Sequence, residues 1–217
     1  MPLPSWFSFF SFGSRRKPIA TVDELIAFIH TRSVFVAQTT LYGYLKTRMG
    51  TRYRQYFEDE VFSRSIRAAA AKTATGCVSD LSIFAIALLS EEGDRLTAIE
   101  AQEAATYCFR RACDHAFSGP DRDELPLDLQ SNFDARAALT DWAHASIAEN
   151  AFSRSPQDLV RYAPVIDEYK DLDHTIVTNS IRFRWREIRD ELRSRLVAED
   201  VRRDWQKHAS SSGATAP

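Results

Sequence analysis

The last long stretch of this sequence repeats its apolar residues with the period of an α-helix, and this pattern constrains the fold more than any other. From position 177 to position 196 the apolar residues follow one another at steps of four, four, three, four and four, which places them along one side of a helix. An amphipathic helix of this kind needs other apolar elements to pack against. We therefore predict a long helix that ends near Trp205 and packs lengthwise on a helical body. The stripe consists of Val177, Ile181, Trp185, Ile188, Leu192 and Leu196.

Composition and capping patterns extend this prediction to the whole chain. Seven glycines and eight prolines among 217 residues are too few for the many turns of an all-β fold. Thr21 with Glu24, and Thr97 with Glu100, have the spacing of a capping box and predict two helix starts. We expect an all-α fold, an irregular bundle of about six or seven helices. Its parts are a segment over 1–18, a single helical domain over 19–208 and a disordered tail over 209–217.

The same patterns give approximate element boundaries. A central helix is expected over 21–49, and Gly76 is expected to divide the helical stretch 53–89 into two. Pro156 in a first-turn position predicts a short helix that begins near Ser155 and ends near Pro164. A helix is also expected over 97–117, a surface loop over 119–130 and a helix over 132–152.

Charge and cysteine usage limit the functional classes. A net charge of −2 and a pI near 6.2 lack the basic surplus of a non-specific nucleic-acid binder. Cys77, Cys108 and Cys113 form an odd, sparse set that resembles buried free thiols of a reducing compartment. The longest apolar run of the body, 83–89, is too short to span a bilayer. These observations predict a cytoplasmic protein without a membrane span.

The first seventeen residues combine apolar rings with positive charge. If the segment is helical, Leu3, Trp6, Phe7 and Phe10 share one face, and serines line the other. The segment is too short to span a membrane, but aromatic rings favour the headgroup level and cations face anionic lipid. We expect an anchor formed by Leu3, Trp6, Phe7, Phe9, Phe10, Phe12, Arg15, Arg16 and Lys17. Because the cations follow the apolar stretch, a secretory signal is not expected.

The sequence is also compatible with two other locations for these rings. They can fill a groove on a partner protein, or they can fold back on their own helical body. Removal of residues 1–17 separates the three possibilities, because only the last one makes the segment part of the core.

Two Asp-His pairs offer an enzyme alternative. Asp141 and His144, like Asp171 and His174, are three residues apart and therefore share a helical face. Such pairs on facing helices can build a carboxylate-bridged di-metal site in a bundle. That site also needs bridging acids, for which Glu60 and Glu103 are available, and it requires both pairs to face inward. A hydrolase with an unrecognised site is the other enzyme alternative, although no nucleophile motif or phosphate-binding loop occurs.

Basic residues cluster around Gly50. Lys46, Arg48, Arg52 and Arg54 alternate with tyrosines and could hold a lipid headgroup or a partner. The alternative is a charged turn whose arginines pair with the nearby acids at 58–60.

One stretch resembles a known group of proteins. Leu41-Tyr-Gly-Tyr-Leu-Lys-Thr-Arg-Met-Gly50, Thr51-Arg-Tyr53 and Phe57-Glu-Asp-Glu-Val-Phe62 resemble uncharacterised helical proteins of alphaproteobacteria, some of them labelled "esterase". The resemblance covers about residues 35–90 and implies a bacterial cytoplasmic origin. The label implies ester hydrolysis, but no catalytic residue is carried over, because no motif here bears that chemistry.

These observations together favour binding over catalysis. We expect a non-catalytic, peripheral membrane-associated interaction or accessory protein on the cytoplasmic face of the inner membrane. Its partners are anionic lipid, a membrane protein complex or both, and we expect no cofactor and no nucleic acid.

Overall fold

The computed structural model describes residues 17–91, 96–117 and 120–213, all helical apart from turns and connections. Seven helices in this part of the chain have seven or more residues, so the predicted all-α bundle is confirmed. The elements are α1 (Val22–Met49), a short 3₁₀ turn η2 (Gly50–Arg52), α2 (Tyr53–Glu58), α3 (Glu60–Leu89), α4 (Ala98–Ala116), α5 (Pro120–Asp123), α6 (Leu129–Ala138), α7 (Arg154–Tyr162), α8 (Asp167–Arg195) and α9 (Ala198–Gly213).

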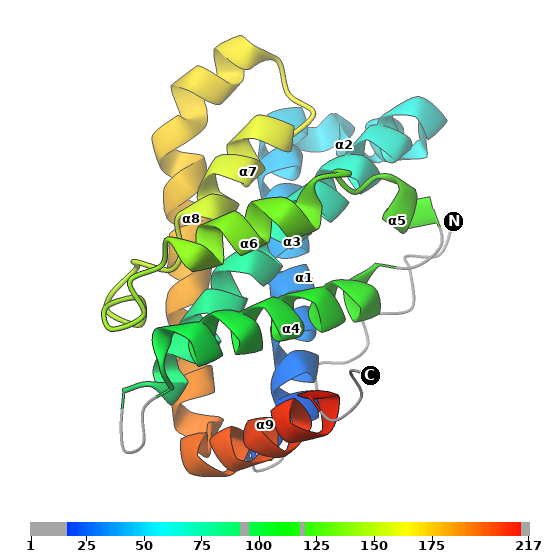
Figure 1. The fold of residues 1–217 in the computed structure, drawn as a ribbon. Helices are drawn as coiled ribbons and strands as arrows, with labels where there is room; N and C mark the ends of the chain where they lie inside the picture. The colour runs from blue at the N-terminus through cyan, green and yellow to red at the C-terminus, as the bar shows by residue number, and fades with distance from the viewer. Residues whose placement is uncertain (1–16, 92–95, 118–119, 214–217) are drawn as a thin grey trace.

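The core forms around α3, which is buried along most of its length from Ile66 to Leu89. Helices α1, α4 and α7 pack against α3, and α8 packs against α7 and α1. Figure 1 shows α1 and α8 along the length of the bundle, α4 crossing them, and α9 at one end. Within the described residues α3 alone has the length and hydropathy of a membrane span. The apolar window of α3 is 94% buried inside the bundle, as in a core helix.

Both predicted helix starts are present, with one difference. Thr97 and Glu100 form a complete capping box at α4. At α1 the Thr21 side chain accepts a hydrogen bond from the backbone of Glu24, but the Glu24 carboxylate accepts from Ala20 instead of Thr21. The spacing therefore located the helix start, while the second capping bond moved back by one residue.

Gly76 does not divide the stretch 53–89, because α3 continues through it. A Cβ atom at this position would lie 2.5 Å from Oδ2 of Asp158 on α7. The glycine therefore permits close approach of α7, and the division occurs earlier, at Asp59.

The helix expected over 132–152 ends at Ala138, and residues 140–151 form turns. Side chains compete with the helical backbone here: Thr140 donates to the carbonyl of Arg136, and Asp141 accepts from the backbone of Ala143. Ala148 adopts a positive φ of 47°, which a continuous helix does not allow.

The predicted single helix up to Trp205 is also two helices, α8 and α9. Leu196 is extended and pairs with Ile19, whose backbone binds Arg195 and Val197 at 2.8 and 2.9 Å. These backbone hydrogen bonds interrupt the helix at Leu196, where the chain around Ile19 packs beside it. Residues 209–213, which the sequence assigned to a disordered tail, continue α9, and Ser210 donates to the carbonyl of Gln206 there.

Candidate functional site

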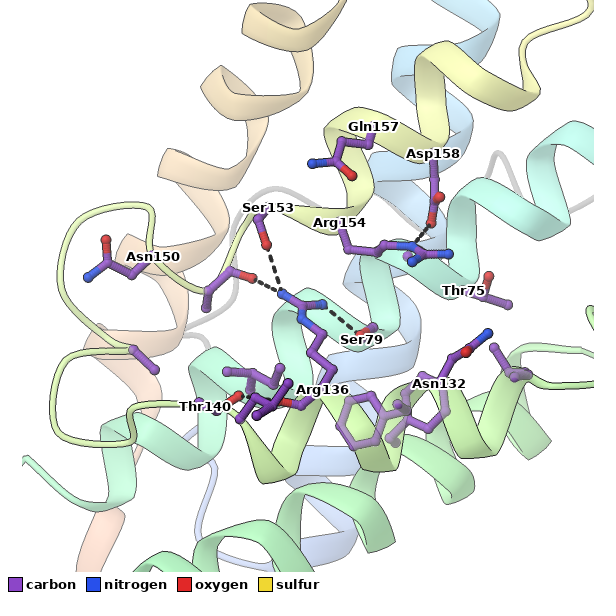
Figure 2. A pocket seen from close by; sticks show the side chains of 18 of the residues that line it. Thr75, Ser79, Asn132, Arg136, Thr140, Asn150, Ser153, Arg154, Gln157 and Asp158 are labelled. Atoms are coloured by element: carbon purple, nitrogen blue, oxygen red, sulfur yellow. Dashed lines mark hydrogen bonds and ion pairs between the residues drawn. The ribbon is translucent and has the colours of Figure 1, made fainter.

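A cavity of about 630 Å³ opens between α3, α6, α7 and the turns over 139–153. Figure 2 shows polar side chains entering it from three elements: Ser79 from α3, Asn132 and Arg136 from α6, and Arg154 and Asp158 from α7. Apolar residues such as Phe109 and Phe133, whose rings stack at 4.0 Å, form part of its wall. The cavity therefore has a mixed polar and apolar lining.

Asp80 lies behind this lining and is completely buried. Its Oδ1 lies 2.7 Å from Nη1 of Arg136, and its two oxygens accept the backbone N–H groups of Arg154 and Ser155 at 3.1 and 2.8 Å. Burial raises the pKa of Asp80, and Arg136 opposes that rise. One carboxylate thus caps the N-terminal turn of α7 and neutralises an arginine of α6.

Arg136 distributes its remaining donors over the cavity wall. It donates to the Ser79 hydroxyl and to the Ala151 carbonyl, both at 2.7 Å. The second bond holds the end of the turn segment against α6, so Arg136 fixes the shape of the cavity mouth.

Arg154 and Asp158 form the second charged pair of the cavity. Nε of Arg154 donates to Oδ2 of Asp158 at 2.9 Å. Burial raises the pKa of Asp158, and the neighbouring Arg154 opposes the rise. The contact of Asp158 with Gly76 places this pair directly on α3.

This arrangement is suited to hydrogen bonding. The side chains of Asn132 and Gln157 also line the cavity, where amides can orient a small polar molecule. Each arginine of the cavity is already matched by an aspartate, so the two pairs add no net charge.

The four residues of the di-metal alternative are all exposed. Asp141 and His144 lie at the cavity, where His144 Nδ1 is 2.7 Å from Asp141 Oδ2, and the two form a pair with each other. Asp171 and His174 lie on the exposed side of α8. The part of the chain that the structure describes contains no group of three or more potential metal ligands. The inward-facing geometry that this alternative requires is therefore not present among these four residues.

The basic patch around Gly50 is divided among different contacts. Arg48 forms a bidentate ion pair with Asp173 of α8, and its guanidinium lies 4.7 Å from the ring centre of Tyr169. The ammonium of Lys46 lies 5.0 Å from the ring centre of Tyr53. Arg52 is exposed beside a second hollow, and the Arg54 side chain lies outside the described residues. The expected pairing with acids at 58–60 is replaced, for Arg48, by an acid far away in sequence.

Most of the predicted anchor lies outside the described residues, since the description starts at Lys17. The Lys17 side chain is 81% exposed and lies 2.8 Å from Glu24. Lys17 therefore has an acidic neighbour. Its hydrogen bond to the Glu24 carboxylate lowers the pKa of Glu24. Arg195 additionally donates to the Lys17 carbonyl, which holds the start of the body in place.

Sequence reasoning missed the cavity residues Asp80, Arg136, Arg154 and Asp158. One signal was available for Asp80: an acid inside the apolar stretch that begins at Cys77 must be paired once that helix is buried. No pattern indicated its partners, because they come from two helices remote in sequence.

The outer side of α8 is a second candidate site. Leu172, Ile176 and Phe183 are 69%, 72% and 63% exposed. They lie opposite the side that buries Val177 and Ile181, so the helix is apolar on both sides. Figure 1 shows α8 at one edge of the bundle, with its N-terminal half (yellow) extending beyond α7.

Comparison of this chain with protein-family models, curated proteins and solved structures gives no significant match.

Proposed function

We propose that this protein is a non-catalytic accessory protein that binds peripherally to the cytoplasmic face of a bacterial inner membrane. Residues 1–17 would hold it at anionic lipid, and the outer side of α8 would make contact with protein. The observation that carries this proposal is the composition of the N-terminal segment, which joins a leucine, a tryptophan and four phenylalanines to three cations within seventeen positions. Aromatic rings at the headgroup level and cations near anionic lipid are the two signals of reversible interfacial binding.

The way the body begins supports this role. Ile19 is buried and bonded to the backbone of Arg195 and Val197, so the N-terminal segment joins the bundle at a fixed point. The end of the segment is therefore held at one place on the body.

The electrostatic contribution can be bounded. Each cation near an anionic leaflet contributes about 1 kcal/mol, and Lys17 shares its charge with Glu24. The electrostatic contributions of two or three cations alone give weak binding. The proposal therefore requires the rings of Trp6, Phe7 and Phe10 to enter the membrane–water interface.

The contacts of the polar groups in the body favour binding over catalysis. Asp80 of α3 pairs with Arg136 of α6 and accepts two backbone N–H groups of α7, and Asp158 pairs with Arg154 within α7. These groups act as structural pairs within the bundle.

Sedimentation with vesicles tests the proposal. The full chain and a chain beginning at Pro18 are mixed with vesicles of phosphatidylcholine, with and without phosphatidylglycerol. We expect the full chain to sediment with the anionic vesicles, and the shortened chain to remain in the supernatant while still folded. Equal sedimentation of both chains would contradict the proposal, and unfolding of the shortened chain would assign the segment to the core.

Two variants of the full chain separate the contributions. Phe7→Ser with Phe10→Ser should abolish sedimentation at any salt concentration. Arg15→Ser with Arg16→Ser should weaken it mainly at low salt, because salt screens exposed charges. Ile99→Ser, at a 71% exposed apolar residue near the start of α4, is the control, and it should leave vesicle binding unchanged.

A further inference from the structure

The exposed residues of α8 follow a regular pattern of their own. From position 169 to position 186 they recur at steps of three, four, three, four and three, the spacing of a coiled-coil seam. All six positions are exposed, and three of them carry the large apolar side chains described above. We call this set the outer seam; it consists of Tyr169, Leu172, Ile176, Asn179, Phe183 and Arg186.

The charges beside the outer seam change sign along the helix. Glu168 and Asp171 lie on one flank near the start of the seam, and Arg182 lies on the same flank near its end, beside Arg186 of the seam itself. Glu168 and Arg186 are separated by about five helical turns, so they lie on one line along the helix. The acidic half and the basic half are thus arranged end to end.

These charges are available for contacts with another molecule. In the described part of the chain, Glu168, Asp171 and Arg186 form no ion pair, and all three are exposed. Arg182 has one long contact, 3.6 Å from Nε to Glu149, and its side chain is 48% exposed.

We propose that the outer seam of α8 binds the outer seam of a second copy of this chain in antiparallel orientation. In that orientation Leu172 lies opposite Phe183 of the other copy, and Ile176 lies opposite Asn179. A two-fold axis near Val177 also sets the acidic half of each helix against the basic half of the other. A parallel pair would instead place acids against acids, which is unfavourable. The inference deepens the proposed function, on which it rests for the role of this face, by naming its partner.

The pairing has a consequence for membrane attachment. A dimer carries two N-terminal segments, and the second segment binds as an intramolecular event once the first is attached. Two weak anchors can then hold the particle where one gives marginal binding.

Sedimentation velocity of the full chain over a range of concentrations tests the pairing. We expect a dimer that Ile176→Asp converts to a monomer. Ile99→Asp is the matched control, because Ile99 is 71% exposed near the start of α4, away from the seam. A wild-type chain that remains monomeric at high micromolar concentration overturns the inference. A dimer that resists Ile176→Asp also overturns it.

A charge exchange tests the antiparallel orientation even if Ile176→Asp impairs folding. In the antiparallel dimer Glu168 of each copy lies near Arg186 of the other copy. Glu168→Arg alone, or Arg186→Glu alone, therefore creates two pairs of like charges, one at each end of the interface. Each should raise the dissociation constant about tenfold. The double variant restores opposite charges and should return the dissociation constant close to the wild-type value. Additive weakening in the double variant overturns the antiparallel arrangement.

These outcomes are distinguishable from failure of the proposed function. Sedimentation velocity is measured without a membrane. If the chain is a dimer but does not bind anionic vesicles, the inference stands and the proposed function is contradicted. If the chain is a monomer and binds the vesicles, the proposed function stands and the inference is contradicted.

Discussion

Asp80 of α3 binds Arg136 of α6 through a 2.7 Å ion pair while it caps the first turn of α7. Three helices, of which α3 is remote in sequence from the other two, therefore meet at one buried carboxylate. Trp185 of α8 joins them through a 2.9 Å hydrogen bond from its indole nitrogen to the Ser155 hydroxyl. The walls of the cavity depend on this junction.

Removing the carboxylate should destabilise the bundle strongly. Asp80→Ala leaves Arg136 without its buried partner and two backbone N–H groups of α7 unsatisfied, which costs about 3–5 kcal/mol of unfolding free energy. Urea unfolding followed by circular dichroism measures the loss. Asp123→Asn, at an exposed acid of α5, is the control and should be neutral. A loss below about 1 kcal/mol for Asp80→Ala would contradict the assigned role of the junction.

Two glycines should respond to alanine with opposite signs. At Gly76 the new Cβ would meet Asp158 at 2.5 Å, so Gly76→Ala should displace α7 and cost about 1–3 kcal/mol. Gly43 lies within α1 with nothing near its Cβ position, so Gly43→Ala should stabilise by about 0.5–1 kcal/mol. Thermal unfolding of both variants checks the difference. If both substitutions changed the unfolding temperature in the same direction, α7 would not approach α3 this closely.

The Arg48–Asp173 pair predicts a specific pH dependence. The hydrogen bonds from Arg48 hold the pKa of Asp173 below its ordinary 3.8, so the ionised pair stabilises the fold above that pH. This stability is lost as the pH falls through the lowered pKa. Asp173→Asn should therefore lower the urea midpoint at neutral pH, and the difference from wild type should shrink in strong acid. Asp190→Asn, an exposed change on the same helix, should show no such pH dependence.

The three thiols should be unreactive in the folded protein. Burial raises the pKa of Cys108 and Cys113 to about 12 and raises that of Cys77 as well, so little thiolate is present near neutral pH. A chromogenic disulfide reagent should label none of them in native buffer and all three in guanidinium chloride. Rapid labelling of one thiol in the native state would identify a reactive cysteine and reopen an enzymatic role.

Local patterns predicted the helical class and several helix ends. Thr97 and Glu100 act on neighbouring backbone groups, so their spacing alone was enough to place the start of α4. The stripe from Val177 to Leu192 likewise identified the buried side of α8.

Contacts between remote residues were beyond this reasoning. The helix over 177–205 is interrupted because Ile19 pairs with Leu196, and α3 is continuous because Gly76 admits Asp158. The cavity was missed for the same reason, since Asp80 and Arg136 become neighbours only when α6 folds over α3. Hydrogen bonds of the Thr140 and Asp141 side chains also accompany the end of a helix that the sequence predicted to continue to residue 152.

The most direct measurement of the central proposal is quenching of Trp6 fluorescence by vesicles that contain brominated anionic lipid. Trp142, Trp185 and Trp205 are buried in the bundle, so they should be shielded from the bromine atoms. We predict quenching of the wild-type chain that Trp6→Phe abolishes, with vesicle sedimentation retained through the remaining rings. Equal quenching of both chains, or none in either, would contradict attachment through the N-terminal segment.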